Sequence, residues 1–334
     1  MIERTVRIEG MGTYLPETKV TSAMLDEKLG LPIGTIEEKT GMRSRRYVTD
    51  ESSSQMGAIA ARRALKESGL DPRELDCIVS CSGVGQQPIP CTASLIQEQL
   101  GLQGTGIPCF DINATCMSFI TGFDIMSHLI HNGQYGRALL VAADISSVGI
   151  NYQHLESSAL FGDGAVAAVL TKGDGHSRVL CSSMRTYSEG AHLTEIRGGG
   201  NALPGYRHTD EHHEDFLFHM DGPAVFKLAL RTIEGFIDEA LAPTGKDLEG
   251  NLPDIAMVIP HQASPSSLAL LRRKLGIPEE KFLNIVQDYG NMIAASVPLA
   301  LHEAVKTGKL HRGDRALLFG AGAGMSFGAI LLDY

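Results

Sequence analysis

The chain has no tryptophan, and aromatic residues make up only 6% of its 334 positions. Its apolar runs stay short of the roughly 18 residues that a membrane-spanning helix requires, so we expect no membrane segment. Cations are also relatively scarce: the 39 Asp and Glu outnumber the 29 Lys and Arg. The formal net charge is therefore −10. This charge argues against nonspecific nucleic-acid binding, and an acidic substrate would need a local basic patch.

Disulfide bonds and metal sites are also disfavoured by the sequence. The six cysteines lie within apolar segments, and the chain runs from Met1 straight into a predicted strand without a secretory leader. We therefore expect reduced thiols in the cytoplasm. Cys77 and Cys81 have no second pair at zinc-ribbon spacing. The run 207–215 holds three histidines beside acidic residues, and we expect a mobile polar loop there and no metal.

The stretch Phe110–Gly122 contains the first candidate for chemistry. Residues 107–112 predict a short buried strand, and the dense apolar residues after Cys116 predict a buried helix that ends at Gly133. At such a strand-to-helix turn, free N–H groups and the helix dipole stabilise a thiolate, so we expect a lowered pKa for Cys116. The alternative is inert packing, since cysteine is among the most buried residues.

The second half of the chain repeats features of the first. The segment Asp254–Ile259 matches Asp76–Cys81, and similar strands begin at Arg137 and Arg315. Together with 43% hydrophobic residues and 37 glycines, the repeat predicts an α/β fold made of two duplicated halves.

The boundary between the halves is predicted at residues 172 and 173, giving halves 1–172 and 173–334. The alternation of strands and helices predicts mainly parallel sheets covered by helices, with a site where the halves meet. Cys116 and Asn291 lie equally far before the glycine that ends the next helix, so Asn291 is predicted on the counterpart of the Cys116 turn.

Three further features point to a site for acyl chemistry. His261 follows the predicted strand 255–259, at the end where parallel sheets bind ligands, although a structural histidine is the alternative. Asn291 lies at another strand-to-helix turn, where it could also be a simple N-cap. The glycine-rich segment 319–328 lacks the Lys-Ser/Thr of a phosphate loop and fits an oxyanion-binding turn better. Together they provide a nucleophile, an imidazole and neutral hydrogen-bond donors.

These segments resemble the β-ketoacyl-acyl carrier protein synthase III family of condensing enzymes, and the likeness covers essentially the whole chain. The resemblance rests on the surroundings of Cys116 and on these segments, in order: Lys39–Arg43, Phe161–Gly164, Val225–Lys227, Pro260–Ala263, Gly290–Ser296 and the terminal glycine loop. It implies a thiolase-like fold in which the two duplicated α/β halves form a layered αβαβα architecture. It also implies a homodimer.

The resemblance further implies a two-stage reaction without a permanently bound cofactor. Cys116 would take an acyl group from acyl-CoA or from an acyl carrier protein. A malonyl thioester on acyl carrier protein would then lose CO₂, and its carbanion would attack the acyl carbon. His261 and Asn291 would stabilise the enolate, and the N–H groups of Cys116 and Gly324 would bind the acyl oxyanion. Neutral donors suit an enolate because a carboxylate would repel its charge.

Other residues receive roles from the same resemblance. Ile89 and Phe161 would line the acyl tunnel, Ile89 in that of the partner subunit. The remaining predicted roles are carrier docking for Lys227, Arg273 and Lys274, and binding of the thioester substrate for Lys39, Arg43 and Ser264.

This chain departs from the family pattern at several of these positions. Ser264 replaces the usual asparagine, and the tryptophan and two arginines that clamp coenzyme A fall at Thr35, Lys39 and Leu155. Because most docking cations are kept while the clamps are lost, carrier-bound thioesters are favoured as substrates.

Several alternatives stay open at this point. The triplet Met117-Ser118-Phe119 resembles the branch that joins two fatty acyl chains head to head, although the glutamate base of that branch falls at Ile89. A starter-unit enzyme of secondary metabolism is equally compatible. A cysteine thioesterase would also use cysteine and histidine. The presence of Cys116 argues against a noncatalytic partner subunit, and the terminal loop lacks the second cysteine of a thiolase.

Overall fold

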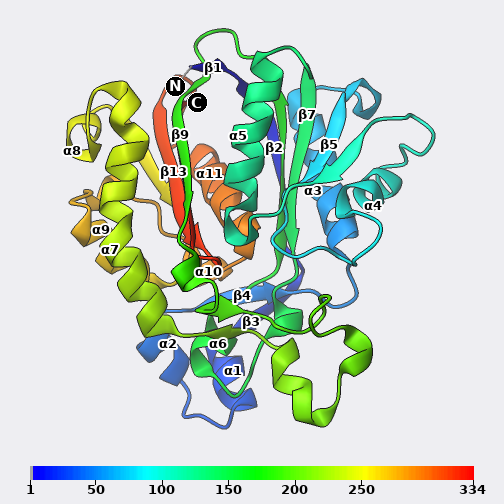
Figure 1. The fold of residues 1–334 in the computed structure, drawn as a ribbon, viewed down its shortest axis with the longest axis vertical. Coiled ribbons are helices and arrows are strands. Elements are labelled where there is room, and N and C mark those ends of the chain that lie inside the picture. Colours follow the sequence, from blue (N-terminus) through cyan, green and yellow to red (C-terminus); the bar gives the residue numbers. More distant parts are fainter. Residues whose placement is uncertain (1–2) are drawn as a thin grey trace.

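The computed structural model describes residues 3–334, which form two five-stranded sheets with helices between and outside them. Figure 1 shows the two sheets side by side, with α5 (Ser118–His131) and α11 (Ser296–Lys306) in the layer between them. The first sheet has the spatial order β2 (Arg7–Tyr14), β8 (Gly164–Thr171), β7 (Arg137–Asp144), β5 (Cys77–Ser80), β6 (Cys109–Asp111). The second has the order β1 (Arg4–Thr5), β9 (Arg178–Thr186), β14 (Ser326–Asp333), β13 (Arg315–Gly322), β12 (Ile255–Pro260).

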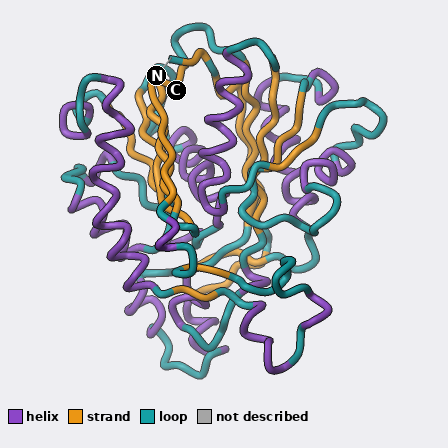
Figure 2. The backbone as a smooth tube through the Cα atoms, in the orientation of Figure 1, coloured by secondary structure: helices purple, strands orange, loops and turns teal. Residues whose placement is uncertain are grey.

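Two outer helix layers complete the architecture. The first sheet is covered by α3 (Ser53–Ser68) and α4 (Thr92–Gln99), and the second by α7 (Gly222–Leu241) and α9 (Pro265–Lys274), next to the short α8 (Leu248–Asn251). The predicted αβαβα layering is therefore confirmed. Figure 2 shows how the loops connect these layers.

A smaller region lies at the foot of the layers in Figure 1. It includes the two-stranded sheet β3 (Thr18–Thr21) and β4 (Ser44–Tyr47), with helices α1 (Ser22–Lys28), α2 (Thr35–Thr40), α6 (Leu155–Leu160) and α10 (Val286–Tyr289).

The middle helices are apolar because they face a sheet on each side. α5 buries Phe119, Ile120, Phe123 and Met126 in one core cluster that also contains the inner side chains of both sheets. The sequence predicted this buried helix, and it begins one short 3-10 turn after the predicted strand. That strand is β6, which covers only three of the predicted residues and is half-buried, because it is the edge strand of its sheet.

The sheets are mixed, so the prediction of mainly parallel sheets is wrong. The parallel pairs are β5 with β6, β5 with β7, and β12 with β13. The other pairs within the two sheets are antiparallel, including β7 with β8 and β13 with β14. A parallel pair needs a crossover connection, whereas β13 and β14 are joined by a tight glycine-rich turn that reverses the chain.

The two halves share one topology. The order β2-β8-β7-β5 in the first sheet corresponds to β9-β14-β13-β12 in the second. Each half also places a long central helix after the same kind of 3-10 turn, Thr115–Met117 before α5 and Ile293–Ala295 before α11. The two turns lie against each other near the junction of the halves.

The N-terminal strand crosses between the halves. β1 pairs with β9, so Arg4 lies opposite Val179 in the second sheet. The Arg4 side chain is fully buried and donates hydrogen bonds to Ser127 and Ser182. The proposed boundary at residues 172 and 173 lies in the connection between β8 and β9.

The polar segment 188–221 contains regular structure rather than a simple loop. It holds the hairpin β10 (Thr194–Glu195) with β11 (His219–Met220) and the 3-10 helices Gly205–Arg207 and Asp210–Phe216. No group of three or more His, Cys, Asp or Glu within residues 3–334 is arranged to hold a metal ion. In the same part of the chain no helix is both long and apolar enough to span a membrane.

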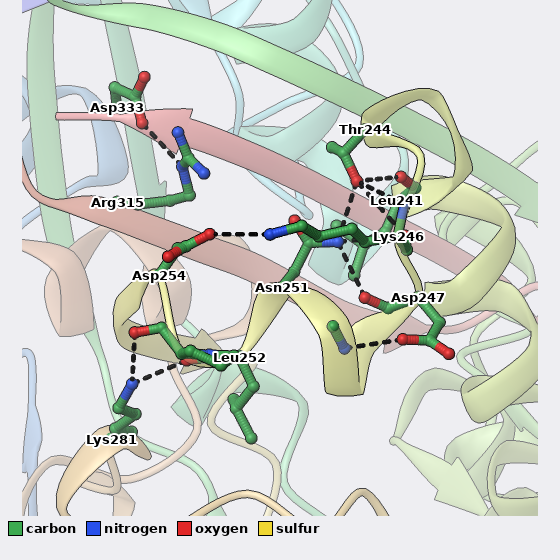
Figure 3. A network of polar contacts seen from close by, with 12 residues as sticks. Leu241, Thr244, Lys246, Asp247, Asn251, Leu252, Asp254, Lys281, Arg315 and Asp333 are labelled. Carbon is green, nitrogen blue, oxygen red and sulfur yellow. Dashed lines mark hydrogen bonds and ion pairs between the residues drawn. The ribbon is translucent and has the colours of Figure 1, made fainter.

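A buried asparagine organises the connection from α7 to β12, which Figure 3 shows from close by. The Nδ2 group of Asn251 donates to Thr244 Oγ1 at 2.9 Å and to the carbonyl of Asp247 at 2.8 Å. Lys281 closes the same connection by donating to the carbonyl of Leu252 at 2.7 Å. These bonds fix the point where β12 enters the sheet, and β12 carries His261 at its other end.

Candidate active site

Cys116 lies in the 3-10 turn that precedes α5, where the chain leaves β6. The turn is fixed by two side chains: Asn113 Oδ1 accepts from the N–H of Thr115 at 2.8 Å, and Ser118 Oγ accepts from the N–H of Ala114 at 2.9 Å. Thr115 adopts a left-handed φ of 52°, which is uncommon for a residue other than glycine. The turn thus holds a half-buried Cys116 at the junction of the two halves.

Cys116 and His261 pack against the same face of β13. A Cβ atom built on Gly320 would lie 2.5 Å from the Cβ of His261, and one built on Gly322 would lie 3.2 Å from the Cβ of Cys116. Residues two apart in a strand point to the same side, so the two side chains are neighbours over one strand. A side chain at Gly320 would clash with His261, and one at Gly322 would crowd Cys116, so glycine suits both positions.

Burial, and to a smaller extent the nearby carboxyl group of Asp144, raises the pKa of the Cys116 thiol to about 12. The N–H groups of Ala323 and of Cys116 itself approach the sulfur and act in the opposite direction. The prediction of a lowered thiol pKa is therefore wrong. Desolvation of the thiolate outweighs a few backbone dipoles here, and no cation within residues 3–334 acts on the pKa of this thiol.

His261 follows β12, and its backbone N–H donates to the carbonyl of Phe319 at 2.8 Å. The side chain is buried, and burial alone lowers the pKa of the imidazole to about 4. His261 is consequently neutral near pH 7 and can accept or donate one hydrogen bond at each ring nitrogen. Within residues 3–334, Nδ1 has no hydrogen-bond partner.

The next residue, Gln262, fixes the end of β12. Its Nε2 donates to the carbonyls of Pro260 at 2.8 Å and Leu283 at 3.1 Å. Its Oε1 accepts from the N–H groups of Ile285 at 2.9 Å and Val286 at 3.2 Å. The buried Gln262 amide therefore uses four hydrogen bonds to hold the backbone that carries His261. The sequence contained this residue in the Pro260–Ala263 motif but gave it no role.

Asn291 lies beside the 3-10 turn of the second half. Its Oδ1 accepts from the N–H of Ile293 at 3.0 Å, while its own N–H donates to the carbonyl of Leu160 at 2.7 Å. Within the described chain, Nδ2 of Asn291 has no hydrogen-bond partner, so it remains available as a neutral donor. Asn291 is buried, with 9% of its surface exposed.

The structure corrects the predicted register between the two turns. Asn291 lies on the counterpart of the Cys116 turn, as predicted, but its own counterpart is Asn113, and Cys116 corresponds to Ala294. The equal spacing to the next glycine was misleading because α5 has 14 residues and α11 has 11. In both halves the glycine follows the last helical residue by two positions, so the shorter helix alone moves the glycine closer to its turn.

The predicted acyl-tunnel residues have different surroundings. Phe161 is buried and forms a parallel bridge with Asn291. Its ring packs edge-on against Phe218, with centroids 4.7 Å apart. Phe218 comes from the segment 188–221 and had no role in the sequence analysis. Ile89 lies in the loop between β5 and α4, and 83% of its surface is exposed.

The residues predicted to bind the thioester lie around the ends of α2 and α9. Lys39 is exposed in the last turn of α2. Ser264 caps α9, because its Oγ accepts from the N–H of Ser267 at 3.2 Å. Arg43 forms a two-bond ion pair with Asp288, including Nε to Oδ1 at 2.7 Å. Arg43 can therefore contact a substrate only if it leaves or shares this carboxylate.

The predicted carrier-docking cations lie on two adjacent outer helices. Lys227 is exposed on α7, and Arg273 is exposed at the end of α9. Lys274 is also on α9, but its Nζ lies 2.8 Å from a carboxylate oxygen of Glu234 on α7. Glu234 offsets this charge, so Lys227 and Arg273 are the stronger candidates of the three.

The glycine-rich turn after β13 completes the surroundings of the sulfur. Thr115 Oγ1 donates to the carbonyl of Ala323 at 3.2 Å, which ties the Cys116 turn to this segment. The N–H that approaches the sulfur belongs to Ala323, the residue before the predicted oxyanion residue Gly324. The sequence pointed to this turn as an oxyanion site but did not single out Ala323.

Family models recognise both halves of the chain. The model described as 3-oxoacyl-[acyl-carrier-protein (ACP)] synthase III matches residues 110–188, and the model for the C terminal of that enzyme matches residues 247–334. The β-ketoacyl-[acyl-carrier-protein] synthase III of Aquifex aeolicus is 37% identical over 328 residues, which cover 98% of this chain and 99% of the relative.

Solved structures show the same likeness. A crystal structure of the Aquifex aeolicus enzyme has a TM-score of 0.87 at 35% identity and covers 98% of this chain and 100% of its own. The synthase III of Pseudomonas aeruginosa has a TM-score of 0.87 at 30% identity, with 99% and 98% covered. The priming β-ketosynthase of the R1128 polyketide pathway has a TM-score of 0.86 at 30% identity, with 99% and 96% covered.

Proposed function

Since this chain belongs to the β-ketoacyl-[acyl-carrier-protein] synthase III family of carbon–carbon bond-forming acyltransferases, we propose that it joins an acyl group carried on Cys116 to a malonyl unit. In the first stage the sulfur of Cys116 bonds to the acyl carbon, the thioester bond of the donor breaks, and the thiol proton leaves with the departing thiol. The product of this stage is an acyl-enzyme.

The second stage uses the two neutral donors of the site. The malonyl thioester loses CO₂, and the electron pair of the broken bond forms an enolate. His261 and Asn291 donate hydrogen bonds to its oxygen, and the enolate carbon attacks the acyl carbon. Cys116 then leaves as a thiolate and takes up a proton from solvent, which restores the thiol. Two neutral donors are suited to this work, because they stabilise the enolate without a buried counter-charge.

The high pKa of the Cys116 thiol fits a first stage in which the thiol loses its proton only after the donor thioester has bound. A thiol that stays protonated near neutral pH avoids oxidation and alkylation until a thioester is bound. His261, which is neutral and next to the same strand face, can then accept the thiol proton and pass it to the leaving thiol. The N–H groups of Cys116 and of Ala323 or Gly324 would bind the oxyanion of the acyl group.

Acyl carrier protein and coenzyme A are the proposed carriers of the substrates, and the reaction needs no permanently bound cofactor. Lys227 and Arg273 support carrier docking because both are exposed on the neighbouring helices α7 and α9. Lys39 and Ser264 would contact the thioester arm near the ends of α2 and α9. The exposed apolar side chains of Val84 and Ile89 support a homodimer in which Ile89 reaches the tunnel of the partner.

The proposed place of action is the cytoplasm, where thiols stay reduced. All six cysteines are free, and burial raises the pKa of Cys77 to about 12 and that of Cys181 to about 11. Buried thiols of this kind need no oxidising compartment.

The proposal rests on one observation: Cys116 and His261 share one face of β13, with Asn291 on the paired turn. Intact mass spectrometry after incubation with a panel of acyl thioesters tests it. We expect an acyl adduct on the wild type, none on Cys116→Ala, and an adduct without condensation on His261→Ala. An adduct on Cys116→Ala contradicts the nucleophile, and release of free acid without a malonyl-dependent product favours a thioesterase.

A further inference from the structure

Asp144 is a fully buried carboxylate beside the site, and neither stage of the proposed reaction uses it. It is the last residue of β7, and none of its surface is exposed. Burial raises the pKa of this carboxyl group to about 7, and the backbone N–H groups of Val84, Gly83 and Ala294 act in the opposite direction.

Each carboxylate oxygen of Asp144 binds a different half of the molecule. Oδ1 accepts from the N–H groups of Gly83 at 2.8 Å and Val84 at 3.1 Å, in the loop that follows β5 of the first half. Oδ2 accepts from the N–H of Ala294 at 3.0 Å, in the 3-10 turn of the second half. The carboxylate therefore bridges the two halves at the level of the active site.

The segments that Asp144 joins are packed without spare room. A Cβ atom on Gly83 would overlap the side chain of Ile293 and would lie 3.2 Å from the carbonyl oxygen of Thr115. The loop of Gly83, the Cys116 turn and the Asn291 turn thus meet at one point.

The bond to Ala294 bears directly on Asn291. Asn291 Oδ1 accepts from Ile293 N–H at 3.0 Å, one residue before the N–H that Asp144 binds. The 3-10 turn is therefore held at two consecutive N–H groups, one by Asn291 itself and one by Asp144. The direction of the free Nδ2 group of Asn291 depends on both bonds.

We propose that Asp144 is a positioning residue for condensation, which fixes the Asn291 turn against the Cys116 turn and so aims the Asn291 amide at the enolate. This inference rests on the proposed function and adds to it a residue that does not touch the substrate. Loss of the carboxylate should impair the condensation stage and leave acyl loading nearly intact, because Cys116 is held by Asn113 and Ser118 within its own turn.

Asparagine is the informative replacement for Asp144 because it has nearly the same shape. Its amide has one acceptor oxygen, so in either orientation an NH₂ group faces backbone N–H groups on one side. The variant must lose either the pair from Gly83 and Val84 or the bond from Ala294. Asp26→Asn is the matched control, since Asp26 is equally buried and accepts from the N–H groups of Gly34 at 2.7 Å and Ile36 at 3.0 Å, away from the turns.

The test measures loading and condensation separately in both variants. Loading is followed by intact mass, and condensation is expressed per mole of acylated Cys116, so that unfolded molecules do not count. For Asp144→Asn we expect a fall of about 10- to 100-fold in the condensation kcat, because a misplacement of about 1 Å can cost 100-fold. Loading should change less than about threefold, and Asp26→Asn should retain both rates within about threefold.

Each outcome has a distinct meaning. Wild-type condensation in folded Asp144→Asn overturns the positioning role. Equal losses in loading and condensation overturn it as well, because they indicate general damage to the site. If Asp144→Asn yields no acylated enzyme, the same two rates are measured for Asp144→Ser. The positioning role is then judged from that variant by the same comparison of condensation with loading. Failure of the wild type to load or to condense instead contradicts the proposed function.

Discussion

Asn113 and Asn291 accept the same hydrogen bond in the two halves of the molecule. Each Oδ1 binds the backbone N–H two residues later, at 2.8 Å for Asn113 and 3.0 Å for Asn291. The amide groups differ, because Nδ2 of Asn113 donates to the carbonyl of Gly83 at 3.1 Å, whereas that of Asn291 has no partner within residues 3–334. The asparagine of the first half therefore supports the turn that carries the nucleophile, and its counterpart in the second half offers a hydrogen-bond donor.

This pair allows the donor role of Asn291 to be tested with a matched control. Asn291→Asp keeps the oxygen that accepts from Ile293 but replaces the Nδ2 donor with a second oxygen. We expect condensation to fall by at least about 100-fold, as on loss of an oxyanion donor, while acyl loading persists. The same change at Asn113 should cost less than about tenfold in either stage. Equal effects at both positions in steady-state and single-turnover assays would refute the role.

The pKa of the Cys116 thiol predicts the pH dependence of its alkylation. Since burial raises that pKa to about 12, the thiolate fraction should grow about tenfold per pH unit between about pH 7 and 10. The rate of iodoacetamide modification, followed at Cys116 by peptide mass, should rise in proportion. A plateau below about pH 8.5, the ordinary thiol pKa, would show that the thiolate is stabilised in the free enzyme.

Gln262 should contribute strongly to stability. Gln262→Leu keeps the volume but leaves the N–H groups of Ile285 and Val286 without their acceptor. At about 1–3 kcal/mol for each of these two groups, we expect a loss of roughly 2–6 kcal/mol in the free energy of unfolding. The control is Gln97→Leu, which removes a single bond to the carbonyl of Ile107 at 2.7 Å. Similar losses in the free energy of unfolding for both variants, measured by urea unfolding, would contradict the prediction.

Ile89 should set the length of the acyl group if it reaches the tunnel of a partner subunit. Ile89→Phe should reduce loading from octanoyl thioesters at least about tenfold relative to acetyl thioesters, because each excluded methylene is worth about 0.8 kcal/mol. Ile33→Phe, at another exposed position with 69% of its surface accessible, serves as the control. Equal losses for both donors in competition assays would exclude a tunnel role.

Carrier docking should depend on Lys227 and Arg273. Reversal of both charges to glutamate should raise the KM for a carrier-bound malonyl thioester by roughly 3- to 10-fold and weaken its salt dependence. A malonyl-pantetheine substrate should be unaffected. Lys309→Glu, at an exposed lysine after α11, provides a control for net charge. Equal changes for both substrates would exclude docking at this surface.

The sequence predicted the two α/β halves, the buried helix after Cys116 and the three candidate residues, because hydrophobic pattern and turn residues are local properties. It did not predict the mixed sheets, since the direction of a strand depends on its connection and on its neighbours. It also did not predict the register between Cys116 and Ala294, because helices of unequal length hide it.

The parts of the site that the sequence missed are long-range contacts. Asp144 is an ordinary aspartate at the end of an apolar strand, and its bond to Ala294 spans 150 positions. The raised pKa of Cys116 depends on burial by segments from the other half. A local pattern contains neither kind of information, so only the folded chain reveals them.

The pairing of β1 with β9 has a consequence for synthesis on the ribosome. Arg4 and Thr5 are synthesised well before their partners Val179 and Arg178. At about 5–20 residues per second, the first strand must wait roughly 10–35 s before it can pair. Throughout that time the nascent chain exposes an unpaired strand and an arginine whose bonding partner Ser182 does not yet exist.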